Sequence, residues 1–175
     1  MQADFDYLCT LIHEFFSQEY IPQRFKVIND YNITGWEIWF QVEFSHFLAS
    51  HISEPEWWRE YKLGFDRRSE KNRLHFRPDF LIRKKGWRVD AYAVLEVKQN
   101  PSMVSCITNM QKDMEKVSKM KRSEIDMRSF WALGIFKANP EDDLKIIAGE
   151  YFPESPSRLI KAEHIENTNF AYLLV

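Results

Sequence analysis

The chain contains Arg77-Pro78-Asp79-Phe80-Leu81-Ile82 and, a short way on, Val94-Leu95-Glu96-Val97-Lys98, and these two stretches decide its fold. Each is an apolar run typical of a strand, interrupted by charge. Side chains alternate between the two faces of a strand, so Glu96 and Lys98 are expected to point to the same face. Asp79 and Glu96 are therefore expected to meet Lys98 at the ends of neighbouring strands.

Length and composition indicate one globular domain spanning residues 1–175. Apolar residues make up 45% and charged residues 29%, an ordinary balance for a domain with a buried core. Neither a long apolar run nor a signal-like start opens the chain, so no membrane association is expected. Cys9 and Cys106 show no metal-ligand spacing and are expected to be thiols in a reducing compartment. We therefore expect a cytoplasmic protein.

Positive charge is concentrated in residues 59–88, which we call the basic segment. The chain has a net charge of −2, but this segment holds eleven Lys or Arg against four Asp or Glu. One interpretation is a solvated, charged hairpin. The other is a surface that binds a polyanion beside a carboxylate cluster, with Trp57, Trp58 and Trp87 available to stack on bases.

Periodicity along the chain predicts helices and strands in alternation. Helical spacing of apolar residues predicts three helices, at about residues 4–19 (ended by Pro22), 36–51 and 104–120. Strand patterns occur at residues 74–83, 91–98 and 131–136, with a weak one at 144–148. The first two are joined by a turn around Lys85-Gly86. The tail from Phe170 to Val175 is either a last strand or a partner-binding edge. The order predicts an α/β sandwich with a mixed sheet.

One acidic residue interrupts the apolar stripe of the second predicted helix. Trp36, Phe40, Glu43 and Phe47 follow one another at helical spacing, so Glu43 lies on the face that packs against the sheet. Burying an isolated charge costs several kcal/mol, so this carboxylate is expected to be paired, protonated or bound to something. A salt bridge to an arginine is the alternative. Glu37, on a neighbouring stripe, is the second choice for the same role.

These residues together resemble a known family. Pro78-Asp79, then Glu96-Val97-Lys98 at the end of an apolar strand, behind an upstream helical Glu43, resembles the PD-(D/E)XK nuclease superfamily. The resemblance covers about residues 36–136, most of the chain. It implies a restriction-endonuclease-like sandwich, in which helices flank a mixed central sheet.

The resemblance also implies further site residues. In many such nucleases the helix after the lysine strand lends a polar residue to the site, and here that helix carries Gln111, Asp113 and Lys116. We take Gln111 as the expected site residue. The strand at 131–136 matches the strand expected next.

Phosphodiester hydrolysis explains why these residue types recur. A hard divalent cation delivers hydroxide to phosphorus and stabilises the leaving oxygen. Asp79, Glu96 and the carbonyl of Val97 are expected to hold Mg²⁺ or Mn²⁺, with Glu43 on a metal-bound water or a second ion. Lys98, near the cation and partly desolvated, is expected to have a lowered pKa and to orient or deprotonate the attacking water.

Three functions from different classes remain. The first is a Mg²⁺-dependent DNA endonuclease of restriction, repair or defence type, acting as a homodimer through the N-terminal helix or the tail. The second is a catalytically silent member of the fold that binds nucleic acid. The third is a protein-interaction factor of the immunity or anti-defence kind. The chain has no GxSxG or Walker motif, which argues against acyl transfer and nucleotide hydrolysis. The pattern does not distinguish DNA from RNA, or a duplex from a single strand.

Overall fold

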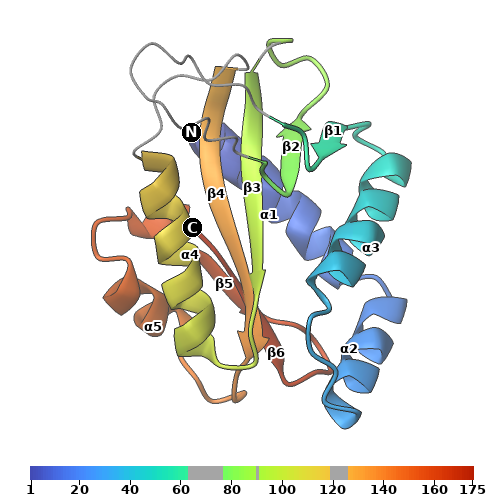
Figure 1. Cartoon of the computed structure of the whole chain (residues 1–175), viewed down its shortest axis with the longest axis vertical. Coiled ribbons are helices and arrows are strands. Elements are labelled where there is room, and N and C mark those ends of the chain that lie inside the picture. Colours follow the sequence, from blue (N-terminus) through green and yellow to red (C-terminus); the bar gives the residue numbers. More distant parts are fainter. Residues whose placement is uncertain (63–76, 90, 119–125) are drawn as a thin grey trace.

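The two stretches around Asp79 and Glu96 lie in a six-stranded sheet, in the order β1-β2-β3-β4-β6-β5 (Figure 1). The structure is a computed structural model that describes residues 1–62, 77–89, 91–118 and 126–175. The strands are β1 (Glu56–Arg59), β2 (Phe80–Arg83), β3 (Ala91–Gln99), β4 (Asp126–Lys137), β5 (Lys161–His164) and β6 (Phe170–Leu174). Only β3 and β4 pair in parallel, and the other pairs are antiparallel. The prediction of an α/β fold with a mixed sheet is confirmed.

Helices cover both faces of the sheet (Figure 1). They are α1 (Gln2–Phe16), α2 (Tyr20–Asp30), α3 (Glu37–Ser50), α4 (Met103–Ser118) and α5 (Leu144–Tyr151), with a short 3-10 turn at Ser157–Leu159. One core forms between α1, α2, α3 and the sheet, and a second forms between the sheet, α4 and α5. In the described part of the chain, no helix is long and apolar enough to cross a membrane.

The predicted alternation along β3 is confirmed. Leu95 and Val97 pack in the core under α1, α2 and α3, whereas Val94 packs on the opposite face. The predicted hairpin is also present, since β2 and β3 pair with Phe80 opposite Leu95. Gly86, in the turn between them, has a φ of +87°, a conformation that glycine adopts without steric cost.

Several elements differ from the sequence-based expectation. Residues 144–148 were expected as a strand but begin α5, because the Asp143 side chain caps this helix by accepting from the backbone of Lys145 and Ile146. Pro22 does not end helical structure; it lies in the first turn of α2, where its missing N–H leaves no hydrogen bond unmade. The short strands β1 and β5 were not expected at all.

The C-terminal tail is an interior strand. β6 hydrogen-bonds to β4 on one side and to β5 on the other, and all of its side chains are buried. The alternative of a partner-binding edge is therefore wrong, and the tail offers no surface to a second copy. Residues 74–76 of the first predicted strand and 119–120 of the third predicted helix lie outside the described residues.

Much of the basic segment, residues 63–76, also lies outside the described residues. Within the described part, two acids from the stretch before the segment neutralise two of its charges. Arg83, which is buried, forms an ion pair with Glu56, and Lys85 forms one with Glu54. The described part therefore presents less positive charge than its composition suggests.

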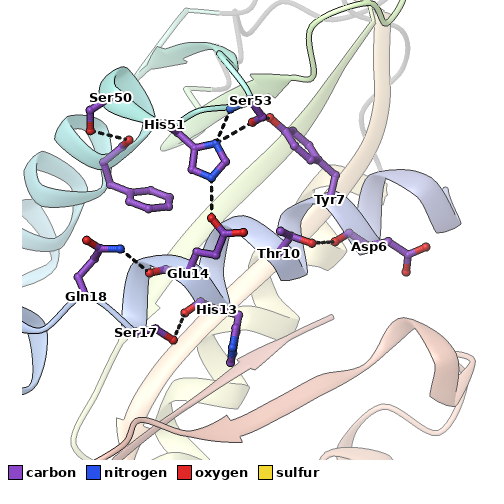
Figure 2. A network of polar contacts seen from close by, with 11 residues as sticks. Asp6, Tyr7, Thr10, His13, Glu14, Ser17, Gln18, Ser50, His51 and Ser53 are labelled. Atoms are coloured by element: carbon purple, nitrogen blue, oxygen red, sulfur yellow. Dashed lines mark hydrogen bonds and ion pairs between the residues drawn. The ribbon is translucent and has the colours of Figure 1, made fainter.

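A polar network links α1 to the end of α3, the helix that carries Glu37 and Gln41. Figure 2 shows His51 between Glu14 and Ser53. His51 Nδ1 accepts from the Ser53 backbone at 3.1 Å, so Nε2 carries the proton and donates to Glu14 Oε2 at 2.8 Å. Tyr7 Oη lies 2.8 Å from Ser53 Oγ and completes the network.

Removing the imidazole should loosen this end of α3. The His51 side chain is only 7% exposed, so His51→Ala removes a packed side chain and leaves the part-buried N–H of Ser53 without its acceptor. We expect a loss of about 1–3 kcal/mol in the free energy of unfolding, measured by chemical denaturation. Glu14→Gln is the control, because its amide oxygen still accepts from Nε2. An unchanged denaturation midpoint for His51→Ala would show that the network contributes nothing.

Candidate functional site

Asp79 and Glu96 meet at the end of β2. Continuing the pairing of Phe80 with Leu95 by one residue brings Asp79 opposite Glu96. Since β2 starts at Phe80, the backbone N–H of Val97 has no strand partner there, and it donates instead to Asp79 Oδ2 at 2.7 Å. The Asp79 carboxylate thus accepts the hydrogen bond that a strand partner of β3 would otherwise accept at Val97.

Gln41 of α3 holds the other oxygen of Asp79. Its Nε2 donates to Asp79 Oδ1 at 2.6 Å, and its side chain is only 3% exposed. Gln41 Oε1 is buried and has no hydrogen-bond partner among the described residues. The sequence did not single out Gln41, although it lies one helical turn after Glu37 and shares its stripe. This shared stripe was the available signal.

Burial and mutual repulsion oppose ionisation of the two carboxyl groups. Burial raises the pKa of Asp79 to about 6, although the hydrogen bond from the Val97 N–H and the charge of Lys98 both lower it. Burial, followed by the nearby Asp79 charge, raises the pKa of Glu96 to about 7. Glu96 Oε2 is buried without a partner among the described residues. The pair therefore favours a proton or a cation between them near neutral pH.

Lys98 is fixed by three acceptors. Its Nζ donates to Glu96 Oε1 at 2.9 Å and to the Val97 carbonyl at 3.0 Å, and it forms an ion pair with Asp113 Oδ2 at 3.0 Å. An ammonium group has three N–H donors, so these contacts use all of them. Burial lowers the pKa of Lys98, but Glu96 and Asp113 raise it more, and the net shift is upward. The expectation of a lowered pKa is wrong, and Lys98 is a cation at neutral pH.

A glycine on β4 allows α4 to bring Asp113 to Lys98. Gly134 is paired with Lys98 across β3 and β4. A Cβ atom at Gly134 would lie 2.3 Å from Met110 Sδ, so a larger residue there would force Met110 to move. Asp113 follows Met110 by one helical turn, and Lys116 holds its other oxygen at 2.5 Å.

Gly134→Ala tests this close approach. The added methyl group must push Met110 or the whole of α4 outward, at a typical overpacking cost of about 1–3 kcal/mol. We expect a lower melting temperature and a weaker Lys98–Asp113 contact. Gly149→Ala is the matched control, since a Cβ atom there meets nothing within 4 Å. A melting temperature for Gly134→Ala at or above that of the wild type would contradict this account.

Gln111 does not take the place expected of it. Its Nε2 donates to the backbone carbonyl of Tyr151 at 2.8 Å, which turns the side chain towards α5. From α4 it is Asp113 that contacts the site. The resemblance indicated a polar residue from this helix, but three were available, and the choice of Gln111 was wrong.

The helical acid nearest the strand ends is Glu37. Burial raises the pKa of Glu37, and Lys98, Glu96 and Asp113 are among the charges that act on it. Glu37 in turn raises the pKa of Asp79. Glu43 is half-buried and acts on Tyr20 of α2. The preference for Glu43 is therefore corrected: the buried face of α3 centres on Phe40, Gln41, Phe44, Phe47 and Leu48, and Glu43 lies at its border.

The oxygen atoms at this site suit a hard divalent cation. Asp79 and Glu96 supply two carboxylates, and the Val97 carbonyl points to the same place, where it accepts from Lys98. The unpartnered Glu96 Oε2 is a further buried acceptor. Within the described ranges, no three His, Cys, Asp or Glu side chains are grouped as a complete ligand set. Two carboxylates with a carbonyl still fit Mg²⁺, which keeps several of its waters.

Comparison with protein-family models, with curated proteins and with solved structures gives no match for this chain. Any function must therefore be argued from the residues of the site itself.

Proposed function

We propose that this protein is a metal-dependent phosphodiesterase of the restriction-endonuclease-like fold that cleaves DNA. The observation that carries the proposal is the meeting of Asp79 and Glu96 at the strand ends. Both carboxyl groups have raised pKa values, and Lys98 is fixed beside them. Two carboxylates that favour a cation between them suit the binding of Mg²⁺ or Mn²⁺ next to an anionic phosphate.

Each residue then has a defined part. When bound, the cation would lower the pKa of a water and neutralise charge on the phosphate. Gln41 and the Val97 N–H hold the Asp79 carboxylate in one orientation, so the carboxylate is already oriented before a cation binds. Lys98, kept protonated by Glu96 and Asp113, supplies a fixed positive charge towards the negative charge that develops at phosphorus. Glu37 replaces Glu43 as the helical acid of the site.

A second candidate function has an observation in its favour. All three donors of Lys98 are already used within the protein, and this arrangement is what a purely structural ion cluster requires. A catalytically silent protein of this fold, which binds nucleic acid or another protein in an immunity or anti-defence role, therefore remains the alternative.

A panel of nucleic acids separates the two. Single-stranded and duplex DNA and RNA are incubated with Mg²⁺, Mn²⁺ or a chelator, and products are resolved on denaturing gels. The proposal predicts cleavage that requires the cation and that is absent in Glu96→Gln. Binding without any cleavage supports the silent alternative. If no nucleic acid is bound even at low salt, both nucleic-acid functions fail and a protein partner is the remaining candidate.

The assembly state bears on the kind of cleavage. One chain offers one site, whereas cutting both strands of a duplex in register requires two. We therefore propose a homodimer for duplex cleavage, formed by a surface other than β6. A monomer mass in light scattering at all concentrations would restrict the protein to nicking or to single strands.

A further inference from the structure

Two exposed aromatic side chains lie on the edge strand beside the carboxylates. Trp58 of β1 is 52% exposed and Tyr61, just beyond the strand, is 42% exposed. Their ring centroids are 5.9 Å apart, so they form one continuous patch. Isolated exposed aromatics need no explanation, but a contacting pair next to a candidate site calls for one.

Strand register places this pair next to the site. Trp58 pairs with Leu81, and Leu81 pairs with Val94. Val94 precedes Glu96 by two residues, so Trp58 lies on the same face of the sheet as Glu96, in the adjacent row. Two residues along a strand span about 7 Å. The backbone N–H of Glu60 also donates to the Asp79 carbonyl at 3.1 Å, which ties this end of β1 to the site.

The Trp58 indole is restrained by a contact with the buried Tyr92. Trp58 Nε1 lies 3.5 Å from the Tyr92 hydroxyl oxygen, and the Arg83 guanidinium lies 5.8 Å from the centroid of the Tyr92 ring. Arg83 is itself buried and donates to the Trp87 carbonyl at 2.7 Å. A ring held in this way loses little conformational entropy when a ligand stacks on it.

We propose that Trp58 and Tyr61 form a stacking platform for an unpaired nucleobase of the substrate. This proposal rests on the proposed function and names its substrate class: single-stranded nucleic acid, or an unpaired segment adjoining a duplex. In a duplex both faces of a base are covered by its neighbours, whereas an unpaired base has a free face for an aromatic ring. The platform would set the base one row along the sheet and one strand across from Asp79, so that the adjoining phosphate approaches a cation held by Asp79 and Glu96.

Binding to a labelled oligothymidylate tests the platform. Fluorescence anisotropy is measured for the single strand and for its duplex with oligodeoxyadenylate, with Ca²⁺ as the cation. Trp58→Ala and Tyr61→Ala are each expected to weaken single-strand binding by about 5- to 150-fold, the usual effect of losing one stacked base. Trp58→Phe should recover part of the affinity, and duplex binding should change little.

Tyr31→Ala is the matched control, because Tyr31 is an exposed aromatic just after α2, away from β1. Wild-type affinity for the single strand in both platform variants would overturn the proposal, even if the wild type cleaves DNA. Single-strand binding that depends on Trp58, without cleavage, would support the platform while the proposed catalysis fails. Absence of nucleic-acid binding, with self-association lost in Trp58→Ala, would overturn it and identify the patch as a protein interface.

Discussion

Glu96→Gln is expected to lower metal-dependent cleavage by at least about 1,000-fold, because the cation and its charge stabilisation contribute several kcal/mol to such a reaction. The fold should survive. The amide oxygen still accepts from Lys98, and the oxygen that becomes an amide nitrogen has no hydrogen-bond partner among the described residues. Cleavage is measured as initial rates with Mg²⁺ and with Mn²⁺. A variant that cleaves at the wild-type rate would remove Glu96 from the site.

Glu96→Gln is a cleaner test than Asp79→Asn. Asp79 accepts from both Gln41 and Val97, one donor on each oxygen. An asparagine keeps only one of these acceptors and sets its NH₂ against the remaining donor. Asp79→Asn is therefore expected to lose about 1–3 kcal/mol of stability as well as activity.

The same substitution should change how the stability of the metal-free protein depends on pH. The pKa of Glu96 is raised to about 7 in the folded state, above its ordinary value near 4.5. A carboxyl group with a raised folded pKa favours folding when it is protonated, and this stability is lost as pH rises towards the folded pKa. With a chelator present, the wild type should lose stability between about pH 5 and pH 8, on the order of 2–3 kcal/mol. Glu96→Gln should show a flatter profile in thermal melts, and equal slopes would contradict this account.

Lys98→Ala is the second large effect. Cleavage should fall by about 100- to 10,000-fold, the usual contribution of one positioned polar group to such a reaction. Stability should also fall by about 3–5 kcal/mol at neutral pH, since Glu96 and Asp113 lose the cation between them. Rates from gel assays and unfolding by urea measure the two losses separately.

A double variant distinguishes a catalytic role for Lys98 from a structural one. In Lys98→Ala with Asp113→Asn, one of the two carboxylates that Lys98 paired with is neutral, which removes its repulsion of Glu96, so part of the stability should return while cleavage stays lost. If cleavage returns together with stability, Lys98 only holds the fold and the ion-cluster alternative gains support. Lys98→Arg keeps the charge and should retain most of the stability.

The sequence was sufficient for the part of the fold that rests on strand patterning. Alternation along β3 and the Gly86 turn predicted the hairpin, and with it the meeting of Asp79 and Glu96. The strand predicted at residues 144–148 was wrong because a short apolar run fits a strand or a helix. Only the cap by Asp143 decides between the two. The strand β1 is too short and too mixed in composition to show a period.

Which side chains reach the site was harder to predict, because this depends on how each helix packs against the sheet. Glu37 and Glu43 lie on neighbouring stripes of one helix, and the rotation of α3 against the sheet decided which faces the strand ends. Gln111 and Asp113 are two residues apart on α4, and the contact at Gly134 sets which one reaches Lys98. The direction of the Lys98 pKa shift required knowing how many carboxylates surround it.

We propose that Asp79 and Glu96 together bind one cation beside the start of β2. The most direct measurement is a crystal structure of the protein soaked in Mn²⁺, with anomalous scattering used to locate the metal. We expect one peak between the two carboxylates, with oxygen ligands from Asp79, Glu96 and the Val97 carbonyl at about 2.0–2.6 Å. An empty site at saturating Mn²⁺, with Lys98 still bridging Glu96 and Asp113, would contradict the claim.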